Sequence, residues 1–184
     1  MTARGVFPGS FNPPTVAHLA IAEAARTQHR LTSIDLVVSR RALAKEHVEH
    51  PGFDDRIEVI RRSIEPFAWL GVVVTESRLL VDIARGYDLL IVGADKWTQI
   101  HESHWYDTAE ARDRALAALP PTAIVPRLGH THPPNRELAL DDATLAAVSS
   151  TRARSGEVHL MAPAARRFAL ETGAWIDPER YDER

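Results

Sequence analysis

The chain has 184 residues, of which 45% are hydrophobic and 26% charged, an ordinary composition for a globular protein. A formal net charge of -3 and a pI near 6.3 argue against general nucleic-acid binding and against a polybasic membrane anchor. Because the chain contains no cysteine, disulfides, thiolate catalysis and cysteine-based zinc sites are excluded. We expect one cytoplasmic domain over residues 1–184, since the sequence has neither a signal-peptide pattern nor a run long enough for a membrane-spanning helix.

Five apolar runs of strand length alternate with segments of helical spacing. Such alternation favours a parallel sheet with helices on both faces, and strands without a polar side fit a sheet that is covered on both faces. We therefore predict an α/β fold, a Rossmann-like doubly wound parallel sheet of about five to six strands. The strands are expected at residues 4–8, 33–39, 69–77, 88–93 and 122–126, and the helices at residues 16–30, 53–65, 79–86 and 107–118.

The pattern is weaker after Pro126. Residues 145–150 are the candidate for a sixth strand, and residues 150–159 are expected to form a short helix or turn. Residues 162–173 have the spacing of a last helix, which ends at a glycine. These segments predict a small C-terminal helical part over about residues 149–184.

The turn after the first strand carries the strongest chemical signal, the sequence Gly-Ser-Phe-Asn-Pro-Pro-Thr-Val-Ala-His at residues 9–18. Ligands of open parallel sheets bind at the carboxyl ends of the strands, and the start of a helix suits a phosphate. Gly9 would let the backbone approach such a ligand closely. Thr15 and His18 are three residues apart and share a helical face, so both could donate to a phosphoryl group. A tight turn with a surface histidine explains the same residues equally well.

These residues resemble the signature G-x-F-x-P-x-(H or T)-x-G-H of the adenylyl- and cytidylyltransferases. The positions that fall on it are Gly9, Phe11, Pro13, Thr15 and His18. Ala17 stands where the family has glycine, and its methyl group is expected to tighten the space around the nucleotide. The resemblance implies that ATP is bound by Gly9, Ser10 and Phe11.

Residues 149–154 resemble a second element of the same superfamily, Ser-Ser-Thr-x-x-Arg. Hydroxyl groups at the start of a helix can cap the helix and donate to an anion. The resemblance implies that Ser150 and Thr151 bind ATP and that Arg154 clamps its β- and γ-phosphates. Arg152 is the competing candidate for this clamp. Taken alone, the element is explained more simply as a helix cap with solvated arginines.

Two further cations match the family after the second expected strand. Lys45, in a polar loop, resembles the lysine that these enzymes hold over the reacting phosphates and against the acceptor. Arg56 resembles an arginine at the start of the next helix that binds the acceptor. Outside the family context both residues would be taken for solvated surface charges.

The fourth expected strand ends in Gly-Ala-Asp, as in the mononucleotide adenylyltransferases. By this resemblance Gly93 and Asp95 contribute to nucleotide binding. A tryptophan some ten residues later stacks on the pyridine ring of the acceptor in that family. Trp105 has this spacing and Trp97 is the second candidate. Without the resemblance, both tryptophans would be expected in the core.

The implied chemistry is in-line displacement, in which the phosphate of the acceptor attacks the α-phosphorus of ATP and pyrophosphate leaves. His18 and Thr15 are assigned to the α-phosphate, and Lys45 and Arg154 to the leaving pyrophosphate. Mg²⁺ would be bound mainly through the phosphates of ATP. We predict no protein-held metal, because the paired histidines lack the spacing of a zinc-protease motif.

The acceptor is predicted to be a small molecule that carries a phosphate. The Gly-Ala-Asp element and the tryptophans favour nicotinate or nicotinamide mononucleotide, and so a role in NAD biosynthesis. Thr15 and residues 79–95 instead resemble pantetheine-phosphate adenylyltransferase. The same motifs would also suit a cytidylyltransferase that prefers CTP, or a non-catalytic, regulatory nucleotide-binding protein. Members of the family often form homo-oligomers, so the resemblance also suggests self-association.

Overall fold

The computed structural model describes residues 2–41 and 50–183. Five parallel strands form one sheet in the order β3-β2-β1-β4-β5. The predicted α/β class, with a Rossmann-like parallel sheet, is confirmed. The strands are β1 (Arg4–Pro8), β2 (Ser33–Ser39), β3 (Leu70–Thr75), β4 (Leu89–Gly93) and β5 (Thr122–Val125).

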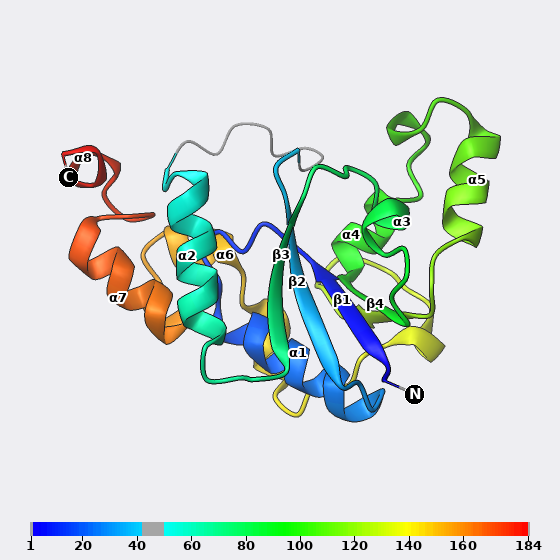
Figure 1. The fold of residues 1–184 in the computed structure, drawn as a ribbon, viewed down its shortest axis with the longest axis horizontal. Coiled ribbons are helices and arrows are strands. Elements are labelled where there is room, and N and C mark those ends of the chain that lie inside the picture. The colour runs from blue at the N-terminus through cyan, green and yellow to red at the C-terminus, as the bar shows by residue number, and fades with distance from the viewer. Residues whose placement is uncertain (1, 42–49, 184) are drawn as a thin grey trace.

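Helices cover both faces of the sheet because successive residues of each strand face opposite sides. On β1, Phe7 belongs to a core with α1, α2 and α7, whereas Val6 belongs to a second core with α3 and α4. Figure 1 shows α2, α7 and α8 gathered beside β3, while α3, α4 and α5 lie at the opposite side of the molecule. The helices are α1 (Val16–Gln28), α2 (Phe53–Ile64), α3 (Leu80–Ile83), α4 (Ala94–Gln99), α5 (Ala109–Ala117), α6 (Ser150–Arg154), α7 (Pro163–Thr172) and α8 (Pro178–Asp182).

The strand register brings the ends of the central strands together at one edge. Phe7 lies opposite Leu36 of β2, and the backbone N–H of Gly9 donates to the carbonyl of Val37 over 3.0 Å. On the other side of β1, Val6 lies opposite Leu90 of β4. The segments that follow these strands therefore meet at the carboxyl edge of the sheet, where ligands of this architecture bind.

The structure differs from three of the predicted elements. Residues 145–150 form no strand, because the carboxylate of Asp142 accepts from the N–H of Thr144 over 2.8 Å and starts a 3-10 helix at Ala143–Ala147. The helix expected at 79–86 is the short α3, which ends where the N–H of Tyr87 closes a turn onto Ala84. The helix predicted at residues 162–173 is observed as α7, which ends at Gly173, but it is not the last helix, since α8 follows. Helix α4 was not predicted at all.

The C-terminal helices pack onto the start of α2. The hydroxyl of Tyr181, in α8, donates to the carboxylate of Asp55 and accepts from the N–H of Gly52 over 3.0 Å. Helix α7 lies along α2 and contributes Ala165 and Ala169 to the larger core. Within the described part of the chain, no helix has the length and apolarity needed to cross a membrane.

Candidate functional site

A cavity of about 660 Å³ lies at the carboxyl edge of the sheet. Its walls come from the segments that follow β1, β2, β3, β4 and β5, together with residues 146–154. This volume is in the range of small-molecule and cofactor sites. The predicted site residues in these walls are Gly9, Ser10, Phe11, His18, Gly93, Asp95, Trp105, Ser150, Thr151 and Arg154.

The loop between β1 and α1 (residues 9–15) folds back over its own glycine. A side-chain carbon at Gly9 would lie only 2.9 Å from the ring of Phe11, so the space above Gly9 is occupied by that ring. Phe11 is 1% exposed and has a φ of 43°, an uncommon backbone conformation for an aromatic residue. Its ring lies edge-on to the imidazole of His18, with centroids 4.9 Å apart. Gly9 is therefore required by Phe11, and not only by a ligand.

Thr15 is the N-cap of α1 and forms a closed pair with His18. The Thr15 backbone N–H donates to Nδ1 of His18 over 2.9 Å, and the Thr15 hydroxyl lies 2.8 Å from the same nitrogen. Thr15 is 1% exposed and takes no part in the cavity wall. Thr15 therefore contacts His18 from behind the cavity, and its direct contact with the α-phosphate stays a prediction.

The pairing fixes which nitrogen of His18 can donate. A backbone N–H can only donate, so Nδ1 must be the acceptor and the neutral imidazole carries its proton on Nε2. His18 lines the cavity, whereas Thr15 lies behind it. The N-cap therefore orients the ring with a single N–H donor, the arrangement needed to hydrogen-bond an oxyanion.

The two arginines of α6 differ in their partners. Arg152 forms an ion pair with Glu157, in which Nε donates over 2.7 Å, and this carboxylate raises the pKa of Arg152. Arg154 donates to the carbonyl of Asn12 and, over 3.3 Å, to the hydroxyl of Thr151, and burial lowers its pKa. Arg154 is therefore the arginine of α6 that reaches the β1–α1 loop, while Arg152 is neutralised by a carboxylate.

Of the two tryptophans predicted after β4, one lies in the cavity wall and the other does not. The absence of a side chain at Gly93 leaves room for the carboxylate of Asp95, which would have to move if a side-chain carbon stood there. Trp105 lines the cavity, and its indole N–H donates to Glu102 over 3.2 Å. Trp97 lies outside the wall, packed against the smaller core with the guanidinium of Arg136 5.1 Å from its ring centroid.

Two of the predicted cationic site residues, Lys45 and Arg56, do not appear in the described wall of the cavity. Lys45 lies outside the described residues. Arg56 is 8% exposed on α2, with its guanidinium 5.3 Å from the ring centroid of Phe53, and is absent from the cavity wall. Burial lowers its pKa, and its Nε has no hydrogen-bond partner within residues 2–41 and 50–183. Ala17 is also buried in the core and does not narrow the cavity.

The charge of the cavity suits an anion. Asp95 is the one carboxylate in the described wall, against five cationic side chains. No cluster of three potential metal-ligating side chains occurs in the described part of the chain. The cationic side chains are Arg78, Lys96, Arg127, Arg152 and Arg154.

The comparison with protein families agrees with this geometry. The sequence model of the cytidylyltransferase-like family matches residues 6–156, which include most of β1, all of β2 to β5 and the cavity walls. The chain belongs to the cytidylyltransferase-like family. The predicted membership of the nucleotidyltransferase superfamily is confirmed, and with it the enzyme class.

Individual relatives of this cytidylyltransferase-like protein carry related names. A probable nicotinate-nucleotide adenylyltransferase of Solibacter usitatus is 27% identical over 169 residues, which are 81% of this chain and 84% of that protein. One of Salinibacter ruber is 31% identical over 123 residues, 60% of this chain and 62% of that protein. The structure of Plasmodium falciparum nicotinic acid mononucleotide adenylyltransferase complexed with NaAD superposes with a TM-score of 0.61 over 95% of this chain and 98% of its own, at 13% identity. At that identity, the superposition supports the fold alone.

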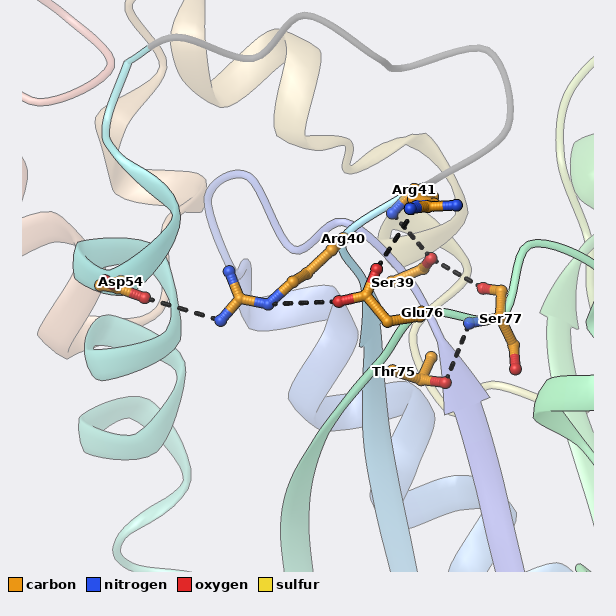
Figure 2. Close-up of polar contacts among 7 residues, drawn as sticks. All are labelled: Ser39, Arg40, Arg41, Asp54, Thr75, Glu76 and Ser77. Carbon is orange, nitrogen blue, oxygen red and sulfur yellow. Dashed lines mark hydrogen bonds and ion pairs between the residues drawn. The ribbon is translucent and has the colours of Figure 1, made fainter.

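Three wall residues of the cytidylyltransferase-like domain were missed from the sequence, although each lies at or just beyond the end of a strand. Ser39 ends β2, and its hydroxyl donates to the carbonyl of Ser77 over 2.7 Å while accepting from the N–H of Arg41 (Figure 2). Arg78 follows β3. Arg127, two residues after β5, donates to the carbonyls of Ala146 and Val148 over 2.8 and 3.0 Å. Position at the end of a predicted parallel strand was the available signal.

Replacing Thr15 tests its pairing with His18. Thr15→Ala should destabilise the protein by about 1 kcal/mol through loss of the helix cap, whereas Thr15→Ser should remain close to wild type. His18 should keep its proton on Nε2 in wild type and in both variants, because the backbone donor persists. Urea denaturation measures the first effect, and long-range proton–nitrogen NMR spectra, assigned with His18→Ala, measure the second. A proton on Nδ1 in the wild-type spectrum would contradict this arrangement.

Proposed function

We propose that the protein transfers the adenylyl group of ATP to the phosphate of nicotinate or nicotinamide mononucleotide, releasing pyrophosphate and forming a dinucleotide for NAD biosynthesis. The observation that carries this proposal is His18, held by Thr15 with its N–H on Nε2, in the wall of a cationic cavity. The names of the two relatives support the same reaction.

The reaction needs no nucleophile from the protein. An oxygen of the acceptor phosphate, already ionised at neutral pH, forms the new bond to the α-phosphorus, and the bond from that phosphorus to the β-bridging oxygen breaks. The protein contributes position and hydrogen-bond donors. His18 donates from Nε2 to the α-phosphoryl oxygens, whose charge changes along the reaction. Thr15 acts through His18 rather than on the phosphate.

The leaving pyrophosphate is assigned to the α6 side of the cavity. Arg154 and the hydroxyl of Thr151 supply donors there. Ser150 lines the same wall, with its hydroxyl hydrogen on the carbonyl of Pro13, and Lys45 remains a predicted partner outside the described residues. A described wall with a single carboxylate, Asp95, fits Mg²⁺ that is bound mainly through phosphate oxygens and few protein ligands. When bound, Mg²⁺ would neutralise charge on the departing pyrophosphate.

ATP and the acceptor are assigned to different walls of the cavity. The β1–α1 loop, through Gly9, Ser10 and Phe11, and the Gly93–Asp95 turn are proposed to bind ATP. Trp105 offers the acceptor an aromatic face, which suits a planar pyridinium ring. Arg56 is buried on α2 outside the described wall, and its role in acceptor binding stays a prediction.

Phosphopantetheine is the weaker candidate for the acceptor. One of its two supports in the sequence was Thr15, and that side chain is buried against His18 instead of facing the cavity. Trp105 in the wall, and the names of the relatives, favour a pyridine ring.

A pyrophosphate-release assay tests the proposal. With ATP and Mg²⁺, we expect turnover with nicotinate or nicotinamide mononucleotide and none with phosphopantetheine. His18→Ala should lower kcat by about 10²–10³-fold, because one donor to the transferring group is lost. A binding measurement with ATP serves as the control, since the variant should still bind the nucleotide. Turnover with phosphopantetheine alone would replace the proposed acceptor, and ATP binding without turnover on any acceptor would favour a non-catalytic protein.

Substitution of Trp105, with Trp97 as the control, tests the proposed contact with the acceptor. Trp105→Ala should raise KM for the mononucleotide about fivefold with little change in KM for ATP, because an exposed aromatic contact with a cation contributes about 1 kcal/mol. Trp97→Ala, which removes a ring outside the wall, should leave both KM values unchanged even where it lowers stability. Steady-state kinetics at varied acceptor concentration decide the matter, and equal effects of the two substitutions would argue against stacking on Trp105.

A further inference from the structure

Residues 12–15, the second half of the β1–α1 loop, are hydrogen-bonded to the C-terminal part of the chain. Three consecutive backbone carbonyls, from Asn12 to Pro14, each accept a hydrogen bond from residues more than a hundred positions away. Thr15 continues the series with an isolated antiparallel bridge to Met161. The donors to the three carbonyls are the guanidinium of Arg154, the hydroxyl of Ser150 over 2.8 Å and the backbone N–H of Ala162 over 2.9 Å.

Trp175 adds a side-chain contact that reaches Asn12 from the far end of this segment. Its indole N–H donates to the Oδ1 atom of Asn12, and both residues are buried, at 6% and 5% exposure. The ring of Phe168 packs at 67° to the indole with centroids 5.9 Å apart, which fixes the indole from the side of α7. Trp175 is absent from the cavity wall and cannot touch a ligand there.

The contact between Trp175 and Asn12 lies in the part of the β1–α1 loop that has the fewest hydrogen-bond donors of its own. Asn12 follows Phe11, whose φ of 43° is held only by its surroundings, and precedes two prolines that have no N–H with which to brace the loop. The side-chain oxygen of Asn12 is buried, so it needs a donor. Trp175 supplies that donor.

We propose that Trp175 is a positioning residue for the nucleotide loop, acting through Asn12 to hold Phe11 and His18 in their binding geometry. The inference rests on the proposed function, since it assigns the loop to ATP. It extends the site to a residue that lies beyond α7 and outside the residues matched by the family model. Without the indole N–H, the loop is expected to shift so that the buried oxygen of Asn12 can find another partner.

Trp175→Phe tests the proposal, because it keeps a buried ring and removes the donor. We expect the Kd for ATP with Mg²⁺, measured by calorimetry, to rise about tenfold, the order of effect when a buried acceptor loses its donor. Trp69→Phe is the matched control. Trp69 is half-buried against the same core under the guanidinium of Arg26, 5.0 Å from its ring centroid, and lies outside the cavity wall. Its substitution should leave the Kd unchanged.

A double-mutant cycle separates positioning from general loss of stability. Asn12→Ala should weaken ATP binding to a similar degree, and the double variant Asn12→Ala/Trp175→Phe should bind no more weakly than Asn12→Ala alone. Two additive effects would overturn the proposal, because Trp175 would then act by another route. A fall in thermal stability of Trp175→Phe with an unchanged Kd for ATP would also overturn it and leave only a structural role.

Hydrogen exchange without ligand makes the test independent of the enzyme's substrate. The N–H groups of residues 9–18 should exchange faster in Trp175→Phe than in wild type or Trp69→Phe, while those of β2 and β3 stay unchanged. If wild type failed to bind ATP, the proposed function would fall, but faster exchange confined to the loop would still support Trp175 as the residue that holds it. Unchanged exchange in the loop would overturn the positioning role.

Discussion

The site depends on a loop that cannot brace itself. Two consecutive prolines, Pro13 and Pro14, have no N–H to donate within the β1–α1 loop, and Phe11 before them holds an unfavourable φ of 43°. Donors to the backbone carbonyls of residues 12–14 come from residues 150–162, and Trp175 donates to the side-chain oxygen of Asn12. The chain thus closes the first strand-to-helix turn with its last third, and the cavity exists where these two parts meet the strand ends.

This construction explains how a modest set of side chains can serve adenylyl transfer. The chemistry proposed here requires no covalent intermediate, so its demands are position and charge. Position is supplied by the N-cap of α1, which uses the backbone of Thr15 to orient His18 with one donor. Charge is supplied by Arg78, Lys96, Arg127 and Arg154 against a single carboxylate in the described wall. The pairing of Arg152 with Glu157 leaves Arg154 as the α6 arginine directed at the loop.

Much of this could be predicted from the sequence, because both motifs lie where apolar strands end and helices begin. The uniformly apolar strands indicated a covered parallel sheet. The spacing favoured Arg154 over Arg152 as the phosphate clamp, and this choice stays a prediction. The three-residue spacing of Thr15 and His18 correctly brought them together, yet spacing carries no information on burial, and Thr15 turned inward. The strand expected at 145–150 failed because side-chain capping by Asp142 and Ser149 outweighed β propensity. Trp175 gave no signal in the sequence, because its partner Asn12 is distant along the chain and accepts through an amide oxygen.

The most direct test follows the fate of the α-phosphorus. Purified protein would be incubated with nicotinate mononucleotide, Mg²⁺ and ATP radiolabelled at the α-phosphorus, and the products separated after a single turnover. The account predicts that the label appears in the dinucleotide while unlabelled pyrophosphate is released in equal amount. Label found in ADP would mean that the bond to the γ-phosphate had been broken, and that result would contradict adenylyl transfer at this site.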